Sequence, residues 1–106
     1  MTFPKIPDMI TRLEFDVGLR DALYGIGQLL QADPTDPTYL ALSNQLKAIE
    51  QWTAGGKDLT QQQKDRVTMG LVAQRELKGD DPDLAALLIG LHNHILRRMP
   101  TAGAKP

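Results

Sequence analysis

The sequence contains no cysteine and only one serine among its 106 residues. Without cysteine there is no disulfide, no thiolate metal ligand and no cysteine nucleophile, which fits a reducing compartment. The one serine, Ser43, falls inside a predicted helix, a poor position for an exposed nucleophile. We therefore expect no catalytic residue, and a protein that is not an enzyme.

The sequence also lacks long apolar runs and an excess of charge. No stretch approaches the roughly 20 apolar residues that span a bilayer. The first eight residues contain two prolines and no apolar segment of signal-peptide length. A net charge of −1 provides no general basic field for the phosphates of nucleic acid. We expect a cytoplasmic protein that binds neither a membrane nor nucleic acid.

What the sequence does contain is apolar residues at helical spacing, interrupted by proline and glycine. No segment shows the alternation of a strand for long enough to matter. The pattern predicts an all-α fold, an antiparallel bundle of about four helices. We expect one domain over residues 1–106, with flexible tails at 1–8 and 100–106. The four helices are predicted at 9–32, 37–52, 60–79 and 82–98.

The predicted helices differ in the strength of their apolar faces. In the first, one stripe is predicted at Ile10, Leu13 and Val17, continued by Leu19, Leu23, Ile26 and Leu30. Glycines within this stretch indicate either a kink near Gly18 or the close approach of a neighbouring helix. The third helix has a weaker face, predicted at Val67, Gly70, Leu71, Gln74 and Leu77. Its start resembles a capping box, with Thr60 three residues before Gln63.

Asp-Pro pairs precede the second and fourth predicted helices. Asp36 and Asp81 stand at the N-cap, and a proline follows each at the first helical position. Asp81 also belongs to a carboxylate cluster with Asp80 and Asp83. These carboxylates complement a helix start, or they form an acidic patch for a basic surface on a partner.

Two histidines and two closely spaced glycines could also carry chemistry. His92 and His94 are two apart, so on a helix they point about 200° away from each other and cannot share a metal ion unaided. Gly25 and Gly27 lack the third glycine of a phosphate loop. We therefore predict no metal and no cofactor. Trp52, near a helix end, is either a core anchor or an interface hot spot.

One stretch resembles a known family. Residues 70–77 (GLVAQREL), 80–84 (DDPDL) and the leucines at 87 and 88 are similar to the second half of small helical immunity proteins that partner type VI secretion toxins. The family in question neutralises an NAD(P)+ glycohydrolase. The pattern is a glycine–alanine helix ending in a basic–acidic pair, a gap, then Asp-Pro and a leucine-rich helix. The resemblance covers residues 70–95.

The resemblance implies a protein that binds its cognate toxin in the cytoplasm and blocks the active site. A toxin that binds a dinucleotide must offer groups that favour phosphate, and an inhibitor could place carboxylates there. The candidate partner-binding residues are Glu76, Asp80, Asp81 and Asp83, with Trp52 as an apolar anchor. Two alternatives stay open: a helical adaptor or homodimeric scaffold, and a small enzyme or ligand-binding bundle that uses His92 or His94 with carboxylates.

Overall fold

The computed structural model describes residues 12–103 of the chain. The predicted N-terminal tail over 1–8 and the first apolar position, Ile10, lie outside these residues. Residues 12–103 form helices and turns without any strand, which confirms the predicted all-α fold. The elements are α1 (Arg12–Ala32), α2 (Pro37–Thr53), η1 (Ala54–Gly56), α3 (Gln61–Asp65), α4 (Met69–Val72), η2 (Ala73–Leu77) and α5 (Pro82–Arg97).

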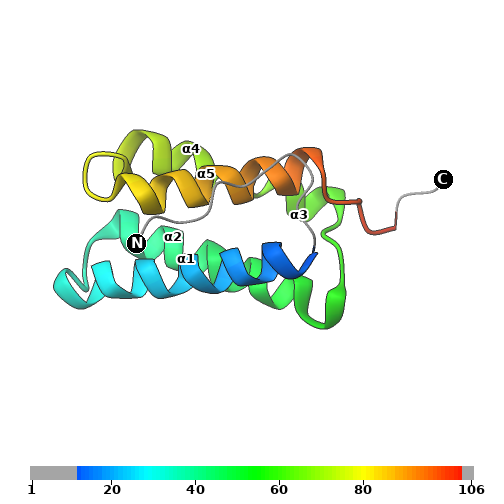
Figure 1. Ribbon diagram of the computed structural model, residues 1–106, viewed down its shortest axis with the longest axis horizontal. Coiled ribbons are helices and arrows are strands. Elements are labelled where there is room, and N and C mark those ends of the chain that lie inside the picture. The colour runs from blue at the N-terminus through cyan, green and yellow to red at the C-terminus, as the bar shows by residue number, and fades with distance from the viewer. Residues whose placement is uncertain (1–11, 104–106) are drawn as a thin grey trace.

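The helices form two antiparallel pairs stacked on each other (Figure 1). One pair is α1 with α2, and the other is α5 with α4 and η2, a turn of π-helix that continues α4. The pairs meet where α1 packs on α5 and α2 on α4. Because α2 and α5 run in the same direction, their two Asp-Pro starts lie at the same end of the molecule (Figure 1).

The core forms where the inward faces of these helices meet. The stripes predicted on α2 (Leu42, Leu46, Ile49) and α5 (Leu84, Leu87, Leu88, Leu91, Ile95) are buried, which confirms both faces. In this described part of the chain, no helix is long and apolar enough to cross a membrane.

The predicted face of α1 was partly wrong. Leu13 and Val17 are 72% and 46% exposed, whereas Phe15, Leu19 and Ile26 are buried. Small residues explain the rotated face, because Gly18 lies against α5. The helix α1 continues through Gly18 without a break. A Cβ atom added to Gly18 would lie 3.2 Å from Leu91 Cδ2, so the glycine permits close packing of α1 on α5.

The third predicted helix is wrong as a single element. The capping box of Thr60 and Gln63 is confirmed, but the helix it opens, α3, ends at Asp65, and α4 begins at Met69. The break turns the second segment, so that Leu71 and Gln74, both predicted to face inward, are exposed.

A side chain from α2 stabilises this break. Gln45 Oε1 accepts hydrogen bonds from the backbone N–H groups of Thr68 (2.8 Å) and Met69 (2.5 Å). Gln45 Nε2 donates to the carbonyl of Arg66 and to the hydroxyl of Thr68. Because Thr68 makes no side-chain cap of its own, Gln45 takes the place of the local N-cap.

Residues after α5 are held against α3. The buried ammonium of Lys64 donates to the carbonyl of Met99 (2.5 Å) and to Thr101 Oγ1 (2.8 Å). The backbone N–H of Ala102 donates to the carbonyl of Leu59 at 2.8 Å. These bonds fix where the chain leaves α5, at the end of the molecule opposite the two Asp-Pro starts (Figure 1).

Candidate partner-binding site

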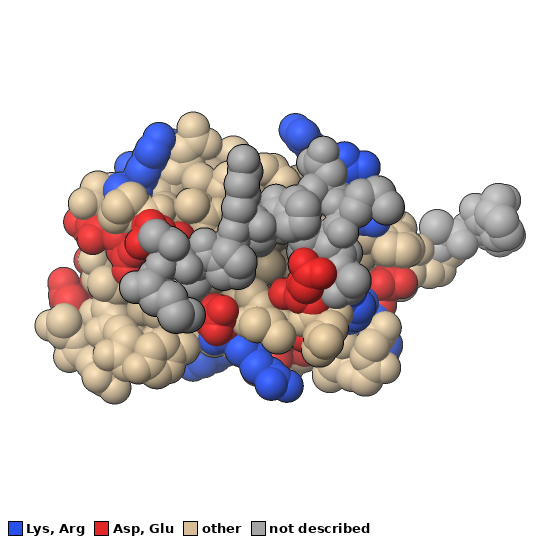
Figure 2. All heavy atoms as spheres, in the orientation of Figure 1, with Lys and Arg blue, Asp and Glu red and all other residues tan. Residues whose placement is uncertain are grey.

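Two turns rich in aspartate lie side by side at one end of the bundle. Residues 33–36 join α1 to α2, and residues 78–81 join η2 to α5. Figure 2 shows carboxylates gathered at this end, on the left of the view. We call it the acidic end, and it is made of Asp33, Asp36, Asp80, Asp81 and Asp83.

A hydrogen bond joins the two turns. The phenol of Tyr39, in the first turn of α2, donates to Asp80 Oδ2 at 2.9 Å. This bond to Asp80 raises the pKa of Tyr39 above its usual 10.0, and burial and the charges of Asp80, Asp36 and Asp33 act in the same direction. The phenol therefore stays protonated at neutral pH, and the carboxylates of both turns contribute to its raised pKa.

Two of the carboxylates serve the helices that they precede. Asp36 accepts from the backbone N–H of Tyr39 at 3.0 Å, and Asp81 accepts from that of Leu84 at 3.1 Å. The capping interpretation is thus correct for Asp81, and Pro37 and Pro82 occupy the first turns as predicted. One oxygen of Asp81 is engaged within the fold, which lessens what it offers to a partner.

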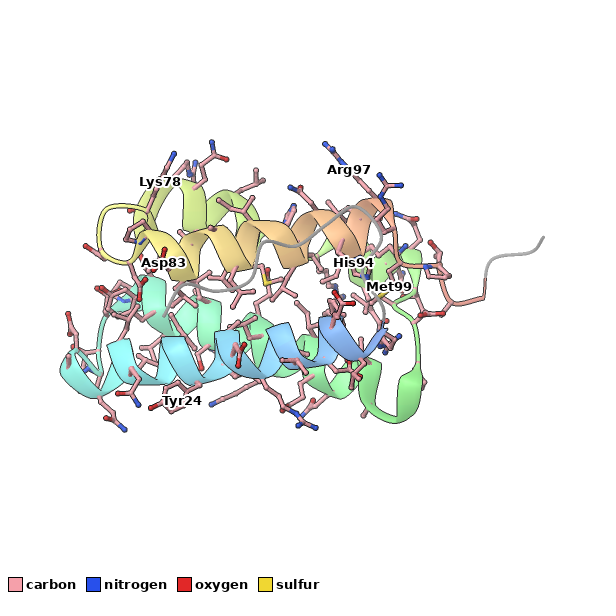
Figure 3. The ribbon with its side chains drawn as sticks, viewed as in Figure 1. Tyr24, Lys78, Asp83, His94, Arg97 and Met99 are labelled. Atoms are coloured by element: carbon pink, nitrogen blue, oxygen red, sulfur yellow. The ribbon has the colours of Figure 1, made fainter. Side chains whose placement is uncertain are left out.

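Asp80, Asp83 and Glu76 are the exposed members of the predicted set, and Asp83 and Glu76 are the two for which no bond within the fold is described above. Asp83 lies in the first turn of α5, with its side chain at the acidic end (Figure 3). Glu76 lies in η2, on the segment that leads into the second turn. Both carboxylates are exposed to solvent, so they are well placed to meet cationic groups of a partner.

Trp52 does not join this group. It lies in the last turn of α2, 13 residues after Tyr39, which places it about 20 Å away along the helix. Its ring is partly buried and packs against the core. The core-anchor interpretation therefore accounts for most of its surface, and the acidic end has no apolar anchor from Trp52.

Sequence reasoning missed Asp33, Asp36 and Tyr39 as neighbours of the predicted cluster. A signal was present, because both Asp-Pro pairs begin helices. Once two antiparallel hairpins are assumed, equivalent helix starts fall at the same end. The bond between Tyr39 and Asp80 spans 41 residues and leaves no local pattern.

The two histidines have different surroundings in the fold. His92 is buried, and its Nδ1 accepts a hydrogen bond from the backbone N–H of Gly70 at 3.1 Å. The ring of His94 lies against that of Phe15, with 5.3 Å between the ring centroids and an angle of 34° between the ring planes. Burial lowers the pKa of both, and for His94 the charges of Arg12, Arg98 and Lys64 lower it further. Among residues 12–103 no three His, Asp or Glu side chains could hold a metal ion together.

Comparison with known protein families gives a match. A sequence model of the Tsi6 family matches residues 17–98, about three quarters of the chain, from the second turn of α1 to the end of α5. Neither the curated proteins nor the solved structures gave a match.

Proposed function

The chain belongs to the Tsi6 family of type VI secretion immunity proteins, and on that premise we propose that it neutralises a cognate toxin by binding over the toxin's active site. The family match over residues 17–98 is the observation that carries this proposal. Such a protein acts in the cytoplasm by occlusion and needs no catalytic residues of its own.

The acidic end is our candidate for the contact with the toxin. A toxin that binds NAD(P)+ has to stabilise the pyrophosphate, so its site presents cationic side chains or backbone N–H groups. Asp80 and Asp83 are exposed at the acidic end, and Glu76 adds a third exposed carboxylate on the adjoining segment. Complementary charge accelerates association and excludes partners of the wrong sign.

The supporting frame around these carboxylates favours a preformed surface. Tyr39 holds Asp80, and the cap formed by Asp81 fixes the start of α5, on which Asp83 stands. A surface that is ordered before binding loses less conformational freedom when the partner arrives. The acidic end therefore suits a tight inhibitor better than a mobile acidic tail would.

We expect the cognate toxin to be encoded by the neighbouring gene, and the test is an inhibition titration with that toxin domain. We expect hydrolysis of NAD(P)+ to fall linearly with added protein and to reach zero at one equivalent. A stable complex in which the toxin keeps its activity would contradict occlusion of the active site. Absence of any complex with that domain would contradict the proposal as a whole.

One observation favours a second candidate function, a homodimeric scaffold. Leu13, Val17 and Tyr24 share one face of α1 and are 72%, 46% and 71% exposed. An exposed apolar row on a helix is typical of surfaces that pair with another helix. Sedimentation of the isolated protein between about 1 and 100 µM tests this alternative. A homodimer whose dissociation constant lies in that range would raise the mean molecular mass as the concentration increases.

A further inference from the structure

Gly27 is a glycine of α1 for which the described fold gives no reason. Gly18 and Gly25, in the same helix, lie against α5, where an added Cβ would be 3.2 Å from Leu91 and 2.9 Å from Leu84 respectively. A Cβ added at Gly27 would meet no atom within 4 Å, and the backbone there does not have a positive φ. Because glycine lowers the stability of a helix relative to alanine, Gly27 weakens α1 without improving its packing.

The side chains around Gly27 are mostly apolar. On the surface of a helix, position 27 adjoins positions 23, 24, 30 and 31. Three of these four are apolar and at least partly exposed, and together with the glycine they form what we call the Gly27 surface: Leu23, Tyr24, Gly27 and Leu30. Tyr24 is the most accessible of them at 71% exposure, and its ring projects from the side of α1 that faces away from α5 (Figure 3).

The Gly27 surface adjoins the acidic end. Gly27 precedes Asp33 by six residues, which is about 9 Å along the helix axis, and Tyr24 is about 13 Å from Asp33 by the same measure. An interface of ordinary size covers about 800 Å² on each partner, a patch roughly 30 Å across. One partner can therefore contact the acidic end and the Gly27 surface together.

The acidic end by itself lacks the features of the centre of a tight interface. Charged residues are depleted at such centres, and a few anchors, among which tyrosine is frequent, provide most of the binding energy. The acidic end consists of aspartates, the phenol of Tyr39 is bonded to Asp80 within the fold, and Trp52 is too distant to serve. Tyr24 supplies an exposed aromatic side chain, and it stands beside helix backbone that no side chain covers at Gly27.

We propose that the Gly27 surface is the apolar centre of the contact with the cognate toxin, with Tyr24 as its anchor and the acidic end as its charged rim. The inference rests on the proposed function and names further residues of that contact. The toxin surface that fits is an apolar patch beside the cationic groups that hold the pyrophosphate. A side chain at position 27 would hold the toxin away from α1, which accounts for glycine where alanine would give a more stable helix.

Gly27→Gln separates binding from folding, because its two effects have opposite signs. Glutamine favours a helix more than glycine does, and a Cβ at this position meets no neighbour, so the urea midpoint of the isolated protein should stay the same or rise. Binding to the toxin domain, followed by surface plasmon resonance, should weaken at least about tenfold, mostly through faster dissociation. A loss of binding in a protein that is no less stable cannot be a folding defect.

Tyr24→Ser removes the anchor, and Leu96→Ser is its matched control. Leu96 is also a large exposed apolar side chain on a helix, 44% exposed, but it lies in the last turn of α5, at the end of the bundle opposite the acidic end. We expect Tyr24→Ser to raise the dissociation constant of the toxin complex at least about tenfold, and Leu96→Ser to change it less than about twofold.

The outcomes separate this inference from the proposed function. If the wild type binds and inhibits the toxin but Gly27→Gln and Tyr24→Ser bind equally well, the proposed function stands and the inference is overturned. Equal losses in Tyr24→Ser and Leu96→Ser would also overturn it. If both Gly27 and Tyr24 variants abolish self-association in sedimentation and leave toxin binding unchanged, the surface belongs to a second copy of the chain. A wild type that does not bind the toxin domain at all would remove the proposed function itself, and this inference with it.

Discussion

The backbone N–H of Gly70 at the start of α4 donates to Nδ1 of His92 on α5, with 3.1 Å between the two nitrogens. The approach depends on the absence of a side chain. A Cβ atom added to Gly70 would lie 2.6 Å from His92 Cγ and 2.7 Å from His92 Cβ. Because these atoms are near the backbone of α5, they cannot move aside as the tip of a flexible side chain can.

Gly70→Ala should therefore lower the free energy of unfolding by about 1–3 kcal/mol, the usual cost of overpacking, because the added Cβ displaces α4 and breaks the hydrogen bond. Urea unfolding followed by circular dichroism measures it. Gly27→Ala is the control, because a Cβ there meets no atom within 4 Å and alanine favours the helix. The control should gain up to about 1 kcal/mol, and equal effects of the two substitutions would refute the packing argument.

Stability should fall as the pH drops below the ordinary histidine pKa of 6.5. Burial lowers the pKa of His92 in the folded protein, so between its lowered pKa and 6.5 the unfolded chain binds more protons than the native one. The stabilisation is complete above 6.5 and is lost as the pH falls through this window. His94 contributes in the same sense.

His92→Asn isolates the contribution of His92. Asparagine Oδ1 can accept the hydrogen bond from Gly70 in place of Nδ1, and it does not titrate. Urea midpoints measured from pH 8 to pH 5 should fall less steeply for the variant than for the wild type. An unchanged slope would show that protonation of His92 does not govern the pH dependence.

Lys64→Met should lower the free energy of unfolding by about 1–3 kcal/mol, because it leaves the carbonyl of Met99 without its charged donor. Methionine keeps most of the length and apolar stem of lysine. Lys47→Met, on the exposed face of α2, should stay within about 0.5 kcal/mol. Thermal unfolding of both variants distinguishes a specific role of Lys64 from a general effect of removing charge.

The aspartates of the acidic end should separate into those that stabilise and those that bind. Asp81→Ala should cost about 1 kcal/mol of stability through the lost cap, whereas Asp83→Asn should cost roughly 0.3 kcal/mol. Asp83→Asn should instead slow association with the toxin, most visibly at low salt. Stopped-flow binding at two salt concentrations measures this, and an association rate that Asp83→Asn leaves unchanged would remove Asp83 from the contact.

Local signals predicted α2 and α5 well. Both begin with Asp-Pro, which fixes a cap and the first φ angle, and both bury the apolar stripe read from their spacing. On α1 the same reasoning chose the wrong face at Leu13 and Val17. Spacing takes account only of large apolar residues, whereas here Gly18 and Gly25 lie against leucines of α5 and allow the two helices to approach closely.

Non-local bonds account for what the sequence did not reveal. The break between α3 and α4 depends on Gln45, which is 23 residues from Thr68 along the chain. The acidic end depends on Tyr39 reaching Asp80 across 41 residues. A hollow at the other end, lined by Arg12, Asp58 and His94 among others, forms only where α1, α5 and the loop before α3 meet, so no local sequence pattern predicts it.

The bonds from Lys64 to Met99 and Thr101, and from Ala102 to Leu59, have a practical consequence for attaching the molecule to a surface. They lead the chain away from the bundle at the end opposite the acidic end (Figure 1). A tether fixed after Gly103 would therefore orient every molecule on a sensor chip with its aspartates outward. A tether on the exposed Lys78, which lies beside the acidic end (Figure 3), would bury the same aspartates against the chip.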